Sequence, residues 1–300
     1  MSPSYFYSFH ILEPYFEKKS IINFEKKIII SLEENIECIQ RMKQETDNYK
    51  ISLKEKIVNK IINVGNRIMN TYVYHTPSGY IMIDTGYEHS LPAVEKKLKK
   101  RRINICDIKY VFLTHAHDDH AGFLNELLYK NQELKVIVSK ESISTLKRGQ
   151  NSFDGGCSTL LALIFCRLMG LFGKAEHRFP PIEDKFNDRF ITINDENKKS
   201  LEDLLQGKIL FTPGHTKDSI SLKKDNIIFC GDVAMNGFPS VKRLIIWIEN
   251  TKQYEQSWEI LLSENADIIY PAHGKPFNKK DLEKYKNAIS KIRLRALKNI

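Results

Sequence analysis

The stretch Thr114-His115-Ala116-His117-Asp118-Asp119-His120 decides how this chain is interpreted. The apolar run Tyr110-Val111-Phe112-Leu113 directly before it is typical of a buried strand, whose end would hold the adjoining loop rigidly. Alternating side chains can point to one side while adjacent ones diverge, so the stretch suits two metal ions better than one. Imidazole and carboxylate groups favour zinc, iron or manganese and exclude a structural zinc site built from thiolates. Four candidate ligands fall within six residues: His115, His117, Asp119 and His120.

The composition indicates a globular protein without a strong nucleic-acid signature. The 300 residues, 42% of them hydrophobic, can bury a substantial core in one large domain or two modest ones. The net charge of +9 would suit an acidic partner such as nucleic acid. However, the lysines are scattered in short clusters, and no long basic block is interleaved with aromatic residues. This spread favours solvated helix faces, and a small-molecule substrate over nucleic acid.

The cysteines and the apolar segments predict a cytoplasmic location. The five cysteines are odd in number and lack Cys-x-x-Cys spacing, which argues against a disulfide framework and for a reducing compartment. The N-terminus has no basic region followed by a sustained apolar run, so no signal peptide is predicted. The longest apolar run, residues 158–172, is shorter than a bilayer crossing and contains Arg167, so no transmembrane segment is predicted.

The pattern of elements changes along the chain. Residues 1–50 fit poorly with the rest of the chain, and we interpret them as an N-terminal extension with one helix and one strand. The region 51–300 forms the main domain, interrupted by an irregular, partly apolar insertion at about 141–206. Strands that come early in each half, with helices after them, favour layered sheets with helices outside. Strands are expected at 57–64, 68–75, 80–83, 110–113, 134–138, 208–211, 219–222, 227–230 and 268–270, with a hairpin turn at 77–79, and helices at 91–100, 121–129, 254–262 and from 279.

Three further candidate ligands come after predicted strands, at turns that contain glycine. Glycine lets the backbone turn tightly and approach an ion closely. A single histidine after a strand is more often structural, but three such ends together with the first motif favour one shared metal site. These candidates are His215 after Pro213-Gly214, Asp232 after Cys230-Gly231, and His273 before Gly274.

Taken in order, these motifs and Asp84-Thr85-Gly86 resemble those of the metallo-β-lactamase-fold hydrolases, over about residues 60–280. The resemblance implies an α/β fold, a four-layered αβ/βα sandwich of two mixed β-sheets flanked by helices, with a two-metal site at one edge. Asp84 would orient a ligand rather than bind a metal. The alternative for Asp84 is a carboxylate that caps the turn at Thr85-Gly86. By position, one metal would be held by His115, His117 and His215, and the other by Asp119, His120 and His273, with Asp232 bridging the two.

The chemistry that this site implies is hydrolysis. Two dications that share one water lower its pKa far enough to give hydroxide at neutral pH, and one of them polarises the scissile oxygen. The metal-bridged hydroxide is the nucleophile, so Asp119 and Asp232 are the carboxylates closest to catalysis. Neither a Gly-x-Ser-x-Gly motif nor a phosphate-binding loop is present. The cofactors implied are two divalent ions, zinc first, with iron or manganese as alternatives.

The spacing of the ligands narrows the expected substrate. His215 and Asp232 are 17 residues apart, and Asp232 and His273 are 41 apart. Such short spacings are similar to those in the lactonase, glyoxalase II and small-hydrolase branches of the family. The RNA-processing branches carry a larger insertion between the corresponding ligands. A small ester, thioester or lactone is therefore expected. Asp232 stands where some true β-lactamases have cysteine, which disfavours antibiotic hydrolysis. The nearby Cys230 is expected to be a core thiol.

Three rival functions remain open. A mononuclear iron persulfide dioxygenase shares the fold and most ligands, and Asp119 and His273 would then be dispensable. A nucleic-acid-binding protein or nuclease of the same fold would use the positive charge. A non-catalytic module stabilised by metal is disfavoured because no ligand position is degraded.

The insertion contains the most apolar segment of the chain. Asp154-Gly155-Gly156 forms a turn before residues 157–173, which are apolar on nearly every side, so a helix there is expected to be covered all round. It would be a buried packing helix or a lid over the metal edge, and a peripheral membrane contact is the third alternative. As a lid it would provide an apolar wall for the substrate, with Phe165, Leu168, Met169 and Phe172 facing the pocket.

Overall fold

The computed structural model describes residue 40 and residues 43–44, 61–172 and 176–297. The chain divides into two compact units, Met1–Lys60 and Ile61–Ile300, and the two sheets and the helices that cover them belong to the second. The helix and strand predicted for the N-terminal extension lie outside the described residues, apart from three helical positions. The boundary predicted at residue 50 stays a prediction.

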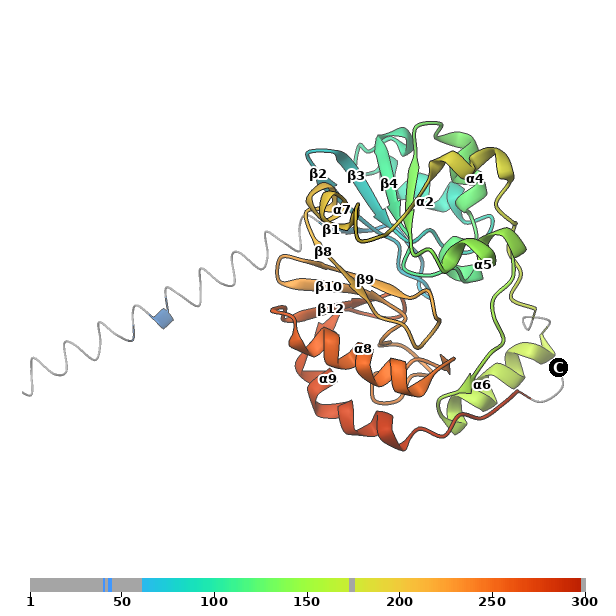
Figure 1. Ribbon diagram of the computed structural model, residues 1–300, viewed down its shortest axis with the longest axis vertical. Coiled ribbons are helices and arrows are strands. Elements are labelled where there is room, and N and C mark those ends of the chain that lie inside the picture. The colour runs from blue at the N-terminus through green and yellow to red at the C-terminus, as the bar shows by residue number, and fades with distance from the viewer. Residues whose placement is uncertain (1–39, 41–42, 45–60, 173–175, 298–300) are drawn as a thin grey trace, which may run out of the picture. The chain divides into compact units, whose positions relative to one another are not determined.

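Two sheets form the middle of the second unit (Figure 1). The first sheet has the order β1 (Ile61–Asn63), β2 (Tyr72–Thr76), β3 (Gly79–Ile83), β4 (Ile108–Phe112), β5 (Lys135–Val138), β7 (Phe190–Thr192). The second has the order β13 (Phe277–Asn278), β12 (Ile268–Pro271), β10 (Ile227–Gly231), β9 (Ile220–Lys224), β8 (Lys208–Phe211). In the first sheet, β3, β4, β5 and β7 run parallel, and β1 and β2 are added antiparallel. Among the described strands of the second, β10 and β12 pair in parallel and the other neighbours are antiparallel.

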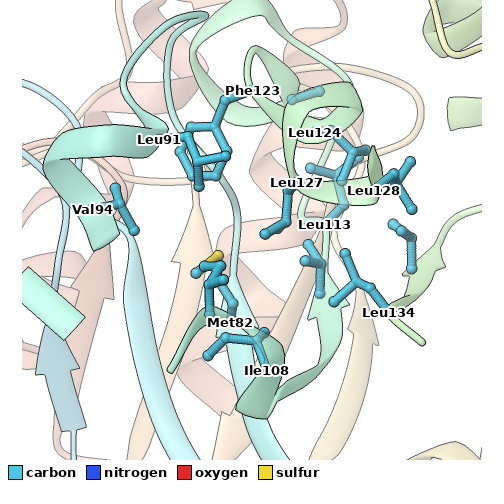
Figure 2. Close-up of a cluster of buried hydrophobic side chains, with 14 of the residues drawn as sticks. Met82, Leu91, Val94, Ile108, Leu113, Phe123, Leu124, Leu127, Leu128 and Leu134 are labelled. Atoms are coloured by element: carbon cyan, nitrogen blue, oxygen red, sulfur yellow. The ribbon is translucent and has the colours of Figure 1, made fainter. Parts of the chain in front are cut away.

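Helices cover the outer face of each sheet (Figure 1). In α2 (Leu91–Lys99), Leu91, Val94 and Leu98 lie on one face and are buried, as the spacing predicted. Figure 2 shows side chains of α2 and α4 (Leu124–Lys130) packed over Met82 and Ile108 of the first sheet. Behind the second sheet, α8 (Thr251–Ser263) packs through Tyr254, Trp258 and Leu261. The other described helices are α3 (Asp118–Ala121), α5 (Ser142–Arg148), α6 (Leu160–Leu171), α7 (Lys198–Leu205) and α9 (Lys280–Tyr285), with short 3-10 turns at Ile105–Asp107, Asp184–Arg189 and Lys286–Lys291.

The order helices, sheet, sheet, helices confirms the predicted four-layered αβ/βα sandwich. Aromatic side chains hold the inner faces of the two sheets together. Phe229 of β10 lies 5.4 Å from Tyr72 and 5.9 Å from Tyr74, both on β2, measured between ring centroids. Each tyrosine hydroxyl is buried but donates to a backbone carbonyl, so neither is left unpaired. The contact between the sheets is therefore mostly apolar, and the two buried tyrosine hydroxyls in it are hydrogen-bonded.

Two local expectations were wrong. The strand expected from residue 68 begins at Tyr72, because the side chain of Asn66 accepts from the amides of Ile68 and Met69 and forms a turn. The helix expected at 121–129 is two helices, α3 and α4, and α3 begins at Asp118, inside the histidine motif. The hairpin at 77–79, by contrast, is confirmed as the turn between β2 and β3.

The segment 141–206 is not irregular as expected. It contains α5 and α7, and its strand β7 extends the first sheet in parallel with β5. Three residues are too few to show the alternation by which a strand is detected. Strand β6 (Gly156–Cys157) leads into α6 and pairs with β11 (Trp247–Ile248) in a separate two-stranded sheet.

Helix α6 forms within the apolar run, but the expectation that it is covered all round was wrong. Ala162 is its one fully buried side chain among the described residues, and large apolar side chains of α6 are exposed. The composition of a helix shows that it is apolar but not whether other elements lie against it. Within the described ranges, no helix is both long and apolar enough to cross a bilayer.

The contact between the sheets predicts the effect of truncating Phe229, which is fully buried. Replacing Phe229 with Ala should lower the free energy of unfolding by about 3–5 kcal/mol, because it leaves a cavity at the centre of the aromatic contact. Phe211, on β8 of the same sheet, is 44% exposed and serves as the control. Phe211→Ala should cost less than about 1 kcal/mol in urea denaturation. Equal costs for the two variants would contradict this account of the interface.

Candidate metal centre

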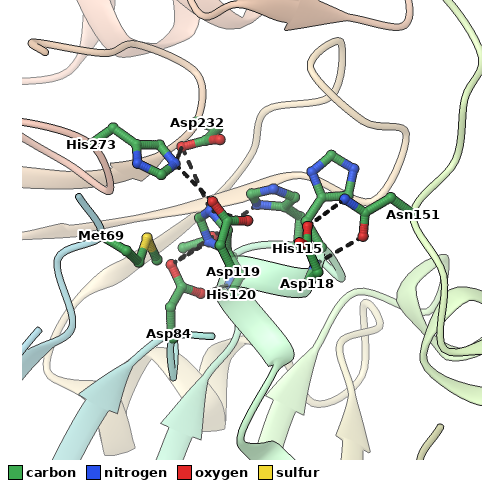
Figure 3. A network of polar contacts seen from close by, with 12 residues as sticks. Met69, Asp84, His115, Asp118, Asp119, His120, Asn151, Asp232 and His273 are labelled. Carbon is green, nitrogen blue, oxygen red and sulfur yellow. Dashed lines mark hydrogen bonds and ion pairs between the residues drawn. The ribbon is translucent and has the colours of Figure 1, made fainter. Parts of the chain in front are cut away.

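The seven predicted ligands come from strand ends at one edge of the sandwich. The stretch from His115 to His120 comes after β4, His215 after β8, Asp232 after β10, and His273 after β12. Figure 3 shows side chains from these separate segments converging. At Gly214, with φ of 130°, an added Cβ would collide with the backbone of Tyr254. Only glycine allows this close approach of the His215 loop to α8.

Three buried histidines form the first group. His215 Nε2 lies 3.1 Å from His115 Nε2 and 3.2 Å from His117 Nδ1. The three side chains each offer a ring nitrogen, and these atoms lie within 4.8 Å of one another. Such a spacing could hold one metal ion, with every ligand a nitrogen.

A second group contains Asp119, His120 and His273. His273 Nε2 lies 3.1 Å from one oxygen of Asp119, and His120 Nε2 lies 3.7 Å from the other. His120 is fully buried and His273 nearly so, while Asp119 is partly exposed. This mixed set of nitrogen and oxygen atoms could hold a second ion.

Asp232 lies between the two groups. Its Oδ1 is 3.6 Å from His120 Nε2 and 3.5 Å from His273 Nε2. Its Oδ2 is 3.5 Å from His215 Nε2, in the first group. The two oxygens of one carboxylate therefore face different histidine groups, which is the arrangement that a bridging ligand requires.

Unpaired buried atoms test whether metal ions fit here. Among the described residues, the buried side-chain atoms without a hydrogen-bond partner include His117 Nε2, His120 Nε2 and Asp232 Oδ1. Buried polar atoms are rarely left unpaired, because the loss of solvation costs about 1–3 kcal/mol each. Two of these atoms, His120 Nε2 and Asp232 Oδ1, lie 3.6 Å apart and are of types that bind metals, which fits a centre built for cations.

The electrostatics of the two groups differ. Burial and the neighbouring imidazoles hold the pKa of His115 and His117 well below the usual range, so both rings are neutral and offer lone pairs. Burial also lowers the pKa of His120 and His273, but nearby carboxylates outweigh it and raise both pKa values well above normal. Without a metal, protons on these two rings would balance the carboxylates, and a divalent ion would replace them.

Three of the candidate histidines are oriented through their other ring nitrogen. His120 Nδ1 lies 2.9 Å from Asp84 Oδ2, and Asp84 in turn accepts from the amide and hydroxyl of Thr114. The Asp84 carboxylate therefore contacts a candidate ligand and does not cap the turn at Thr85-Gly86. His215 Nδ1 and His273 Nδ1 lie 2.8 Å from the carbonyl oxygens of Trp247 and Ile68. Such contacts fix the ring orientation of a metal ligand.

Two acidic residues for which the sequence predicted no role form hydrogen bonds that hold the loop of residues 115–120 in place. Asp218 accepts from the amide of Ala116 at 2.9 Å and from the hydroxyl of Ser142 at 2.7 Å. Asp118, in the middle of the motif, exchanges two hydrogen bonds with Asn151. Figure 3 shows Asp118 turned towards Asn151, away from the second histidine group. Neither carboxylate belongs to a metal group among the described residues.

The other predicted residues lie outside the cluster of ligands. Cys230 is a core thiol, as predicted: it is fully buried, its Sγ lies 3.7 Å from the carbonyl of Ala234, and burial raises its pKa. Of the four predicted pocket residues, Phe165 and Met169 of α6 are half-buried, whereas Leu168 of α6 and Phe172, directly after the helix, are exposed. Their assignment to a substrate pocket stays a prediction.

Comparisons with known proteins all point to one protein family. The family model of the metallo-beta-lactamase superfamily matches residues 64–273. A lactamase-like protein of Aspergillus niger is 28% identical over 207 residues, which cover 68% of this chain and 49% of that protein. A metallo-beta-lactamase fold-containing protein of Sulfurisphaera tokodaii is 27% identical over 231 residues, covering 75% and 80% of the two chains. The chain spans about half the length of the first curated relatives that it matches.

Solved structures agree on the fold. A metallo-beta-lactamase of Cronobacter sakazakii superposes with a TM-score of 0.55 at 20% identity, over 78% of this chain and 92% of that one. At this identity the likeness supports the sandwich fold and does not extend to substrate.

The contact between Asp84 and His120 predicts how Asp84→Asn behaves. The amide keeps an acceptor for Thr114 but loses the negative charge beside His120, so zinc affinity should fall by about 10- to 100-fold with the ligands still in place. Competition with a chelating dye measures this. The control is Asp107→Asn, because Asp107 also accepts a backbone amide but lies in the turn before β4. A crystal structure with Asp84 bound directly to metal, or unchanged affinity, would contradict the orienting role.

Proposed function

The chain belongs to the metallo-β-lactamase superfamily, and we propose that it is a hydrolase that uses two divalent metal ions to cleave a small ester, thioester or lactone with an apolar group. The observation that carries this proposal is the position of Asp232, whose two oxygens face separate histidine groups. Beside the three histidines of the first group, Asp119, His120 and His273 offer three further candidate ligand atoms close together, which supports two metals over one.

The surroundings of each residue suggest its role. His115, His117 and His215 would hold one ion, and Asp119, His120 and His273 the other, with Asp232 shared. When bound, such a pair of ions activates a water at neutral pH and polarises the bond to be cleaved. Zinc suits the nitrogen-rich first group, and iron or manganese are also compatible with the donors. Asp84 and the carbonyls of Trp247 and Ile68 would keep the rings in position.

Apolar side chains close to the site support a substrate with an apolar group. Ile68, whose carbonyl holds His273, is 64% exposed, and Phe153 is 52% exposed. The Phe153 ring lies 6.3 Å from the ring of His177, which pairs with Asp118 of the histidine motif. Substrate sites usually combine such apolar walls with a few polar groups.

Helix α6 is connected to the same site through two contacts of the backbone. His215 Nδ1 contacts the carbonyl of Trp247, and Trp247 pairs with Cys157, which ends the strand before α6. This connection supports the proposal that the half-buried Phe165 and Met169 form an apolar wall for the substrate, while the exposed Leu168 and Phe172 face solvent.

Removing the shared carboxylate tests the site. Asp232→Ala should lose one or both metals and lower the rate of hydrolysis at least about a hundredfold, because activation of water needs both ions. The assay is a panel of ester, thioester, lactone and phosphodiester substrates on protein loaded with zinc or manganese, with metal content measured in parallel. Asp195→Ala, at an exposed loop position, is the control and should match the wild type. Two tightly bound metals and full turnover in Asp232→Ala would refute the assignment.

The apolar wall has its own test. Met169→Gln should raise KM for long-chain esters more than for short ones, because only a long chain reaches the wall. Steady-state kinetics over a series of acyl lengths measures this. Ile164→Gln, at an exposed position of the same helix, is the matched control. Equal changes for short and long substrates, together with a lower melting temperature, would show that Met169 is a packing residue and not part of a pocket.

A further inference from the structure

Helix α6 presents a continuous apolar stripe to solvent. Five exposed side chains of α6 fall within a sector of about 100° around the helix, from the helical repeat, and the exposed Phe172 directly follows the helix. Phe238, 75% exposed, extends the apolar surface, since its ring lies 5.9 Å from that of Phe165. The stripe consists of Leu160, Leu161, Ile164, Leu168, Leu171 and Phe172, of which Leu171 and Phe172 are 83% and 78% exposed.

The opposite side of α6 anchors it to the protein. Ala162 is buried, and Phe165, Cys166 and Met169 are half-buried. The hydroxyl of Thr159 accepts from the amide of Ala162 at 3.0 Å and caps the N-terminus of the helix. The stripe is therefore the outer face of a fixed helix. Single exposed apolar residues are ordinary, but a contiguous patch on an anchored helix marks an interaction surface.

Cations, and no carboxylates, occur in the two segments of the chain that form this surface. Arg167 is exposed at its edge. The segment 286–297 meets β6 at one point, where Cys157 and Arg295 exchange backbone hydrogen bonds of 2.9 and 3.1 Å, and Figure 1 shows the end of this segment passing close to α6. This segment carries the exposed side chains of Lys291, Arg293 and Arg295. Neither residues 155–172 nor 286–297 contain an Asp or Glu.

We propose that α6 and the segment 286–297 dock the protein on an anionic lipid surface. The apolar stripe would enter the boundary between headgroups and acyl chains, and the cations would pair with lipid phosphates. At 12 residues, α6 is too short to cross a bilayer and suits a position in its plane. A second copy of the chain is a poorer partner, because a symmetric contact between two stripes would bring Arg167 and its neighbours against like charges. The proposal does not depend on hydrolase activity.

Co-sedimentation of the full chain with vesicles tests the proposal. The protein should sediment with vesicles of equal parts phosphatidylglycerol and phosphatidylcholine, bind phosphatidylcholine alone more weakly, and dissociate as salt is raised. Ile164→Gln/Leu171→Gln should lower the partition into the mixed vesicles at least about tenfold. Tyr129→Gln, which removes a side chain 52% exposed on α4, should bind as the wild type does. Thermal melting confirms that all three proteins are folded.

Four results would overturn the proposal. The first is no sedimentation of the wild type with anionic vesicles, and the second is equal binding by the wild type and the double variant. The third is a lipid-free dimer, seen by light scattering, that the double variant dissociates, because a second copy would then cover the stripe. The fourth is a raised KM of the double variant for a soluble ester, because the stripe would then line the substrate pocket.

Discussion

The buried carboxylate of Asp232, set between two groups of histidines, is the constraint on which the rest of the site depends. A carboxylate in this position is costly unless positive charge surrounds it. Here the charge comes from protonated imidazoles or from metal ions, and burial makes either interaction strong. The backbone after Asp232 is fixed from behind, because Trp258 of α8 donates to the carbonyl of Val233 at 2.8 Å. Helix α8, on the outer face of the second sheet, thus helps to position Asp232 at the edge where the candidate ligands meet.

Hydrogen bonds between the two sheets keep the ligand-bearing loops in register. Asn70, before β2, donates to the carbonyls of Pro271 and Gly274 on either side of His273. In the other direction, the amide of Ile220 in β9 donates to the carbonyl of Thr114 at 2.8 Å. Because each sheet holds a loop of the other, the site forms only when the sandwich closes, which links its geometry to the stability of the fold.

The order of the expected strands and helices predicted layered sheets, and the resemblance of the motifs predicted the four-layered sandwich. The seven residues that the structure brings together could be predicted because residue types that bind metals and come directly after apolar strands form a strong local pattern. The sequence could not predict the contacts of Ile68 and Trp247, since any residue has a carbonyl oxygen. The roles of Asp218 and Asn151 depend on contacts between segments distant in sequence. Strand β7 was too short to detect, and the exposure of α6 depends on which elements lie against it.

The metal content of the purified protein tests the central claim most directly. Mass spectrometry for metals, with protein concentration from amino-acid analysis, should find two divalent ions per chain in protein that hydrolyses an ester, thioester or lactone. Removal of the ions by a chelator should abolish this hydrolysis, and zinc or manganese should restore it. A single iron per chain, or hydrolysis that persists in protein stripped of metal, would contradict the account.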